Sequence, residues 1–263
     1  GGSSYTDLSN GGVYSNVTTA TMNITGATLA MNGYFYRCKV SGTCTPVVYS
    51  NGALLTVLPN IITVCQTLSG CPGQLVVPLN VTDFIGVAAL SMVIGFDPSV
   101  LTYSGYQNLN TNLNGGTFAA NAVAGKLYMT WSRTTAATIA NGAVLVELKF
   151  NGVTGSTPLI WDTQTPGYCE YSDLTGQIIF STWTNGNVTV YQPPLITSTP
   201  VNKTIYAGGS TTFSVTATGN GLGYQWQVST NGGGSFSNLT NGSPYTGVTT
   251  ATMTINPANL TLN

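Results

Sequence analysis

Nearly the same 32-residue stretch occurs at both ends of this chain. Residues 1–32 align without a gap with residues 232–263, a shift of 231 positions, and 17 of the 32 aligned residues are identical. The most similar part reads NVTTATMNITGATLAMN in the first copy and GVTTATMTINPANLTLN in the second. A fixed period of this kind is the signature of repeat architectures. The sequence therefore predicts one period of a tandem array plus a 32-residue overlap.

The composition excludes several classes of function. Charged residues make up 5% of the chain, against roughly 25% in an ordinary soluble protein. The formal net charge is −1, so no basic surface can neutralise phosphates, and we expect no nucleic-acid partner. No apolar run reaches the roughly 20 residues that a membrane helix needs, and we expect no membrane insertion. The chain shows no signal segment at its start, which is the expectation for an internal slice of a longer secreted protein.

Cysteine spacing favours short disulfide loops. Cys38 and Cys44, and again Cys65 and Cys71, are separated by five residues. Zinc sites use closer pairs and commonly histidine, and this chain has no histidine. We therefore predict the disulfides Cys38–Cys44 and Cys65–Cys71 in an oxidising compartment. Cys169 is then unpaired, unless it takes Cys65 or Cys71 as its partner.

Side-chain alternation predicts an all-β protein. In the segment KLYMTW, the apolar residues Leu127, Met129 and Trp131 fall on one face of a strand. Similar period-2 segments recur along the chain between Gly, Asn, Pro and Ser residues, and almost nothing has a helical period. This pattern is typical of β-sandwiches.

Proline-bearing linkers divide the chain into three parts. The segments TVLPN and YQPPLITSTP carry proline, which cannot donate a hydrogen bond to a strand ladder and therefore marks the ends of sheets. We predict domain boundaries at 1–59, 60–192 and 193–263. When the last part is followed by the first part, with the 32-residue overlap counted once, the two together make one complete module.

The joined outer parts have the strand order of an immunoglobulin-like domain. Trp226 takes the place of the core tryptophan of the third strand, and Tyr36 stands two residues before Cys38, as in a tyrosine corner. Val215 occupies the position that would pair with Cys38 across the sheets. The chain thus opens with a partial immunoglobulin-like domain and closes with another. Either a continuing chain completes each half, or neighbouring subunits complete them head to tail.

These motifs resemble known families. The segments YQWQVSTNGG and YRCKVSGTC resemble immunoglobulin-like repeats of very large Bacteroidetes surface proteins, such as the SprB-like gliding-motility adhesins. The segments VVPLNVTDFIGVAALSMVIGFDPSVLTYSG and WTNGNVTVY resemble a cohesin-like domain. The resemblance implies a central jelly-roll β-sandwich flanked by two partial immunoglobulin-like β-sandwich domains. It also implies export by the type IX secretion system and an extracellular location at the cell surface.

The segment WDTQTPGYCEYSD is the one dense acidic and aromatic stretch. Its carboxylates Asp162, Glu170 and Asp173 suit a hard cation such as Ca²⁺, although their spacing fits no EF-hand and a surface loop is the competing interpretation. Exposed aromatic rings can bind sugars, which makes three residues ligand candidates, whereas Trp131 and Trp226 fall on inward faces and are predicted to be core. The three ligand candidates are Trp161, Tyr168 and Tyr171.

Three functions compete for this chain. The first is a non-catalytic structural repeat of a long extracellular adhesin or filament, whose partners are adjacent repeats or head-to-tail subunits. The second is a cohesin-like module that binds a dockerin-type protein or a surface polysaccharide. The third is an embedded hydrolase, which is disfavoured because carboxylates are sparse and no histidine exists to act as a base for a serine or cysteine nucleophile. We predict no catalytic residue and no obligatory cofactor, and we favour the first function.

Overall fold

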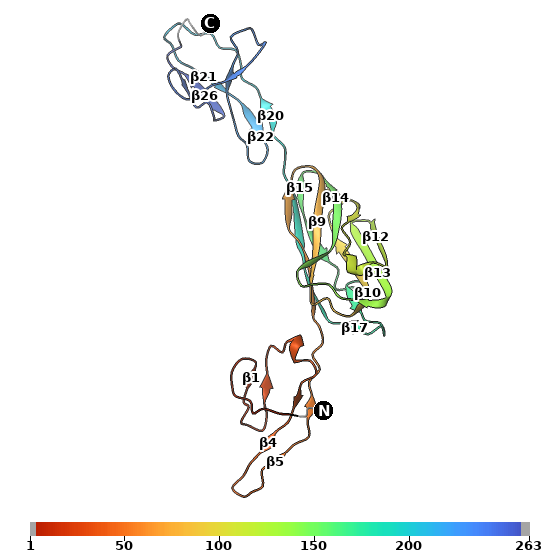
Figure 1. Cartoon of the computed structure of the whole chain (residues 1–263). Helices are drawn as coiled ribbons and strands as arrows, with labels where there is room; N and C mark the ends of the chain where they lie inside the picture. Colours follow the sequence, from red (N-terminus) through yellow and green to blue (C-terminus); the bar gives the residue numbers. More distant parts are fainter. Residues whose placement is uncertain (1–3, 259–263) are drawn as a thin grey trace.

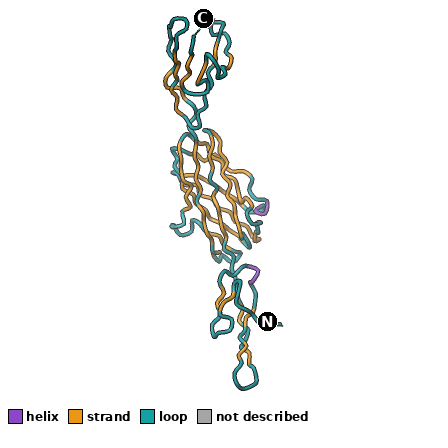
Figure 2. Tube along the Cα trace, turned by 90° about the vertical axis from the view of Figure 1, so that its left-hand side faces the viewer, coloured by secondary structure: helices purple, strands orange, loops and turns teal. Residues whose placement is uncertain are grey.

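The computed structural model describes residues 4–258, and its secondary structure is almost entirely β-strand, as the alternation predicts. Residues 61–190 form two packed sheets (Figures 1 and 2). The first sheet has the order β12 (Thr117–Val123), β13 (Lys126–Ala137), β10 (Val87–Gly95), β15 (Gly155–Trp161), β19 (Gly186–Val190) and β8 (Leu68–Gly70), and β16 (Glu170–Ser172) pairs with β10 and with β17 (Ile178–Ile179). The second sheet has the order β11 (Leu101–Gln107), β14 (Ala143–Gly152), β9 (Gly73–Thr82), β7 (Ile61–Cys65) and β18 (Ser181–Thr184).

The core lies between these sheets because one face of each strand is apolar. Leu127, Met129 and Trp131 of β13 are at most 1% exposed, which confirms the predicted inward face. Strand β14 departs from strict alternation, since both Leu145 and Val146 are fully buried. A register shift against β9 occurs at this point, and a bulge of this kind turns two consecutive side chains toward the same side.

The first and last strands of the sandwich run parallel to each other. Strand β7 pairs with β18 in parallel, from Ile61 opposite Ser181, and β8 pairs with β19 in parallel, ending at Gly70 opposite Val190. Because both runs point the same way, the chain enters at one pole of the sandwich and leaves at the opposite pole. Figures 1 and 2 show the flanking segments at these two ends.

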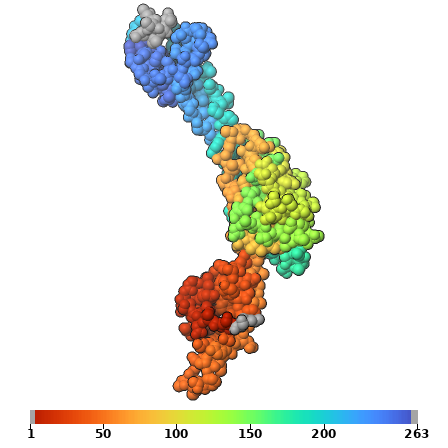
Figure 3. All heavy atoms as spheres, viewed as in Figure 1, coloured from red at the N-terminus to blue at the C-terminus, as the bar shows by residue number. Residues whose placement is uncertain are grey.

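The flanking segments contain short strands in small sheets. The N-terminal unit (residues 4–59) has β1 (Tyr14–Ser15), β2 (Asn23–Ile24), the 3₁₀ turn η1 (Leu29–Met31), β3 (Phe35–Tyr36), β4 (Lys39–Val40), β5 (Val48–Tyr49) and β6 (Ala53–Leu54). The C-terminal unit (residues 193–258) has β20 (Leu195–Ser198), β21 (Thr211–Ser214), β22 (Thr216–Thr218), β23 (Gln227–Val228), β24 (Ser237–Asn238), β25 (Tyr245–Thr246) and β26 (Thr252–Ile255). Within residues 4–258, these strands form two- and three-stranded sheets and pair with no strand of the sandwich. Figure 3 shows the resulting row of three bodies.

The sequence repeat is also a structural repeat. In the first copy β1 pairs with β2 so that Tyr14 lies opposite Ile24, and in the second copy β25 pairs with β26 so that Tyr245 lies opposite Ile255. Each pair of residues differs by 231 positions. The short bridge that precedes the hairpin also recurs, between Gly11 and Tyr14 and between Gly242 and Tyr245.

The turn inside each hairpin repeats bond for bond. The hydroxyl of Thr19 donates to the carbonyls of Asn16 and Thr21 at 3.0 and 2.8 Å. The hydroxyl of Thr250 makes the same two bonds, to Gly247 and Thr252, at the same lengths. Asn16 and Gly247 have φ of 59° and 74°, a region that glycine adopts freely and asparagine tolerates. The end of the second copy, residues 259–263, lies outside the described residues.

One further 3₁₀ turn, η2 (Thr111–Leu113), lies in the central sandwich. Among residues 4–258, no helix has the length and the apolar character that crossing a membrane requires.

Candidate binding surface on the central sandwich

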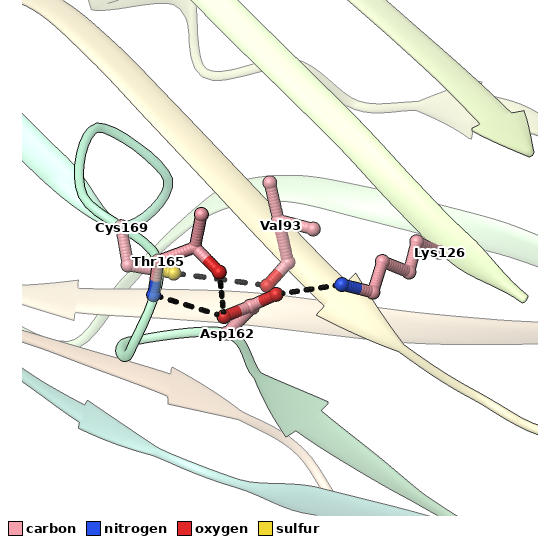
Figure 4. A network of polar contacts seen from close by, with 5 residues as sticks. All are labelled: Val93, Lys126, Asp162, Thr165 and Cys169. Atoms are coloured by element: carbon pink, nitrogen blue, oxygen red, sulfur yellow. Dashed lines mark hydrogen bonds and ion pairs between the residues drawn. The ribbon is translucent and has the colours of Figure 1, made fainter.

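The predicted acidic and aromatic stretch begins where β10 changes partners. Strand β10 pairs with β15 at Ile94 and Gly95 but with β16 at residues 89–91. Residues 162–169, which connect β15 to β16, therefore leave the sheet and pass over Val93. The amide of Asp162 donates to the carbonyl of Val93 at 2.9 Å, and the Cys169 thiol contacts the same oxygen at 3.7 Å (Figure 4).

Asp162 anchors this 162–169 loop to the sheet. Its Oδ2 atom accepts from Lys126 Nζ of β13 at 2.8 Å, and its Oδ1 atom accepts from the amide and hydroxyl of Thr165 at 3.2 and 2.9 Å (Figure 4). The hydrogen bond with Lys126 lowers the pKa of Asp162 and raises the pKa of Lys126. The carboxylate is thus already neutralised and held by the loop's own groups.

An aromatic pair extends this surface. The rings of Tyr128 and Tyr168 meet edge to face, with centroids 5.7 Å apart, and Lys126 Nζ lies 5.7 Å from the Tyr168 ring centroid. All three side chains are partly exposed. Lys126, Tyr128, Asp162 and Tyr168 therefore form one polar and aromatic cluster, which we call the loop cluster. It presents an ion pair and two partly exposed aromatic rings at the surface.

The acidic residues of the stretch do not gather around one point. Glu170 accepts from the amide of Gly167 at 2.9 Å, and Asp173 accepts from Thr175 and from the amide of Gln177. No group of three or more His, Cys, Asp or Glu residues in the described range 4–258 could hold a metal ion. The structure gives no support to Asp162, Glu170 and Asp173 as a calcium site, because each carboxylate already accepts hydrogen bonds from different neighbouring groups.

Two of the three proposed ligand aromatics are core residues. Trp161 is 4% exposed and donates its indole N–H to the carbonyl of Thr184 at 2.9 Å. Tyr171 is fully buried, and its hydroxyl lies 2.6 Å from the hydroxyl of Thr63. Their interpretation as ligand contacts is therefore wrong, because their rings fill the space between the sheets. Tyr168 alone keeps an exposed ring surface.

Sequence reasoning missed Lys126 and Tyr128 as members of this surface. A signal was present, because both alternate with the inward residues Leu127 and Met129 and must lie on the outer face of β13. What the alternation could not show is that the 162–169 loop folds onto that face.

The predicted disulfides are not supported, since all five cysteines, which lie within residues 4–258, have free thiols. Cys65 ends β7 with its side chain turned into the core of the sandwich, whereas Cys71 follows β8 of the other sheet and is exposed. Cys38 and Cys44 are both exposed around the β4–β5 hairpin without bonding each other. Burial raises the pKa of Cys65 to about 12 and that of Cys169 to about 11.

We expect two classes of thiol in the native, reduced protein. Cys38, Cys44 and Cys71 should react within the mixing time of a thiol-specific chromogenic disulfide at pH 8, because they are exposed. Cys65, which is buried, should react only after unfolding, and Cys169, which is partly buried, should react much more slowly than the exposed thiols, because burial raises both pKa values and keeps the thiols protonated. Mass mapping of the labelled peptides assigns each site. Slow labelling of any of the three exposed thiols would contradict this arrangement.

The Asp162–Lys126 ion pair should make the stability of the sandwich depend on pH. The folded pKa of Asp162 lies below its ordinary value of 3.8, so its contribution is fully present above the unfolded pKa and is lost as the pH falls through the lowered folded pKa. Asp162→Asn should therefore reduce the Tm of the sandwich at pH 7, and the difference from the wild type should shrink below about pH 4.

Thermal unfolding from pH 2.5 to 7 measures this difference. In the background of Lys126→Met the cost of Asp162→Asn at pH 7 should be smaller, because the hydrogen bond from Lys126, the main cause of the lowered pKa of Asp162, is then absent. An equal Tm difference between the wild type and Asp162→Asn at pH 3 and pH 7 would show that the carboxylate charge is not its source.

Comparisons with known proteins give one family match, which lies in the central sandwich. Residues 63–190 match the family model of the cohesin domain. This is the region of the parallel first and last strands, the 162–169 loop and the buried core. Among curated proteins, no sequence matches the chain.

Solved cohesin structures are similar to about half of this chain. A non-cellulosomal cohesin from Archaeoglobus fulgidus has 13% sequence identity and a TM-score of 0.42, covering 50% of this chain and 91% of that one. The seventh ScaB type I cohesin from Pseudobacteroides cellulosolvens has 20% identity and a TM-score of 0.41, covering 50% and 92%. A cohesin–dockerin complex from Clostridium thermocellum has 14% identity and a TM-score of 0.43, covering 50% and 99%.

Proposed function

We propose that this chain is a non-catalytic structural repeat unit of a long extracellular adhesin or filament, with the cohesin domain as its central module. One observation carries the proposal. The same hairpin, with the same pairing and the same turn bonds, occurs 231 residues apart on the two sides of a sandwich whose chain ends leave at opposite poles. A repeat with this geometry lengthens an array by one sandwich for each period.

The division into 1–59, 60–192 and 193–263, with immunoglobulin-like outer parts, belongs to the same proposal. Display at the cell surface, adhesion in gliding and export by the type IX system rest on the resemblance to the SprB-like adhesins. A non-catalytic role is supported by the chemistry of the chain: it has no histidine, and the thiols of Cys65 and Cys169 have raised pKa values that make them poor nucleophiles.

Immunogold electron microscopy tests this function. An antibody raised against the 263-residue chain should label fibres on the outside of intact source cells at a regular spacing. The same antibody preabsorbed with the purified chain is the control and should leave the fibres unlabelled. Label confined to permeabilised cells would refute the proposal.

A second candidate function is recognition of a dockerin-type protein. The specific observation in its favour is the match of residues 63–190 to the cohesin domain family. The loop cluster then supplies an exposed surface where such a partner could bind. A surface polysaccharide, which would use the ring of Tyr168, is the other ligand that we propose for this surface.

Calorimetric titration with dockerin domains in the presence of Ca²⁺, together with a glycan array, tests this second function. Tyr168→Ala should weaken any binding at the loop cluster, while Thr182→Ala, on the exposed surface of the other sheet, is the matched control. No binding in either assay would leave the structural role alone.

A further inference from the structure

Strand β12 is an edge of the first sheet and pairs on one side only, with β13. Figure 1 shows it at the margin of the sandwich. In an antiparallel pair, alternate residues turn their N–H and C=O groups away from the neighbouring strand. Within residues 4–258, the backbone of β12 makes no hydrogen bond beyond the ladder with β13. One row of donors and acceptors along this strand is therefore free to pair with another strand.

This edge lacks the features with which natural proteins protect sheet edges, namely charged side chains, proline, bulges and short length. Its sequence TFAANAV contains no charge and no proline, and its 7 residues pair with β13 without a register shift. The other edge strands of the described sandwich are different. Strands β8, β17 and β18 have 3, 2 and 4 residues, and β11 has a register shift between Tyr103 and Gly105. A long and regular free edge thus occurs at β12.

Partly exposed apolar side chains lie beside this edge. Phe118 of β12 packs against the core from its margin, and Tyr106 of β11 meets it edge to face, with ring centroids 4.8 Å apart. Tyr106 is 38% exposed, and Val123 at the end of β12 is 56% exposed. A strand that joined β12 would cover these side chains and also pair with the free backbone groups. Main-chain hydrogen bonds then supply affinity, and the side chains supply specificity.

The side chains of β12 fit a second copy of the same strand in antiparallel orientation. With Ala120 opposite its own counterpart, Phe118 lies opposite Ala122 on the inward face, so a large side chain meets a small one on both sides of the axis. On the outward face, Ala119 lies opposite Asn121, and no like charges meet. Each strand presents the same surface that it receives, as a two-fold symmetric contact requires.

We propose that two copies of this chain associate through β12, which pairs antiparallel with the β12 of the second copy and joins the two first sheets into one. The contact is two-fold and closed, so it stops at two copies. Because the paired strands run in opposite directions, the pole where the chain enters one sandwich lies beside the pole where it leaves the other.

This association is lateral and goes beyond the proposed function, which concerns growth along one chain. Its orientation has a consequence that does rest on the proposed function. In a surface fibre built from such repeats, antiparallel pairing joins fibres that point in opposite directions, as the fibres of two facing cells do.

Charge exchange at the two outward positions tests this pairing by sedimentation of the full 263-residue chain under reducing conditions. The wild type should sediment increasingly as a dimer as its concentration rises. Ala119→Lys with Asn121→Lys places a lysine opposite a lysine twice, and should raise the dissociation constant about tenfold or more. Ala119→Glu with Asn121→Glu should have the same effect. A mixture of these two variants should form mixed dimers, because each lysine then faces a glutamate.

Thr182→Lys with Thr184→Lys is the matched control, because both residues are exposed on β18, an edge of the other sheet. This variant should dimerise as the wild type does, and urea unfolding verifies that the sandwich of each variant is intact. A wild type that stays monomeric would overturn the proposal. An equal dissociation constant for the wild type and the β12 lysine variant would also overturn it, and would assign the dimer to another surface.

A mixture of the lysine and glutamate variants that forms no dimers would overturn the antiparallel register. None of these results depends on the labelling of fibres on cells, so failure here is distinct from failure of the proposed function.

Discussion

Replacing Trp131 by alanine is expected to lower the free energy of unfolding of the central sandwich by about 3–5 kcal/mol. The indole is 1% exposed, and its N–H donates to the carbonyl of Leu113 at 3.0 Å. Its neighbour Gly116 approaches so closely that an added Cβ would overlap the indole ring. The backbone at Gly116 thus forms part of the wall of the space that the indole fills, so the cavity left by the substitution cannot readily collapse.

Urea unfolding monitored by tryptophan fluorescence measures this loss. Trp161 and Trp183 remain in the sandwich of the variant as reporters. Trp226→Ala is the matched control, because Trp226 is only partly buried and lies in the C-terminal unit, outside the two sheets. It should leave the transition of the sandwich unchanged. An effect of Trp131→Ala no larger than that of the control would show that the indole does not support the core.

Replacing Tyr171 by alanine should cost a similar amount, about 3–5 kcal/mol, by comparison with other buried aromatic residues. Its ring is fully buried, stacks on Trp183 at a centroid distance of 5.1 Å and meets Phe84 edge to face at 5.4 Å. If Tyr171 were instead a ligand-binding tyrosine at the surface, its replacement by alanine would lower the free energy of unfolding by less than about 1 kcal/mol. Urea unfolding therefore distinguishes the core position seen in the structure from the ligand role expected from the sequence.

The hydroxyl of Tyr171 can be tested separately from its ring. Tyr171→Phe should cost about 1–3 kcal/mol, because it leaves the buried hydroxyl of Thr63 without its partner. The double variant Thr63→Val with Tyr171→Phe should recover part of that loss, since both polar groups are then absent. If the two single losses simply add, the 2.6 Å contact between the hydroxyls contributes no coupling energy.

Alternation and repetition are two features that could be predicted correctly from sequence, as could the resemblance of the central part to a cohesin domain. The inward face of β13 follows from local chemistry, because neighbouring side chains of a strand must point to opposite sides. The hairpin repeats for the same kind of reason. Its pairing and turn bonds join residues within one short stretch, so equal sequences form equal structures at both ends of the chain.

The aromatic residues of the acidic stretch show where local reasoning stops. Trp161 and Tyr171 stand beside turn residues, which suggests a surface loop. Their burial depends on the pairing of β15 and β16 with β10, a strand more than 60 positions earlier in the chain. The spacing of Cys65 and Cys71 likewise does not show where each thiol points: Cys65 of β7 faces the core, whereas Cys71 lies exposed between β8 and β9.

The sequence by itself determined that this chain is all-β and that residues 1–32 recur 231 positions later. Only the tertiary structure decided that the first and last strands of the sandwich run parallel and that the 162–169 loop lies over Val93 of β10. The physical reason is the range of the interactions. Turns and alternation are set by neighbours along the chain, whereas strand pairing and burial join residues more than a hundred positions apart, as Thr63 and Tyr171 are.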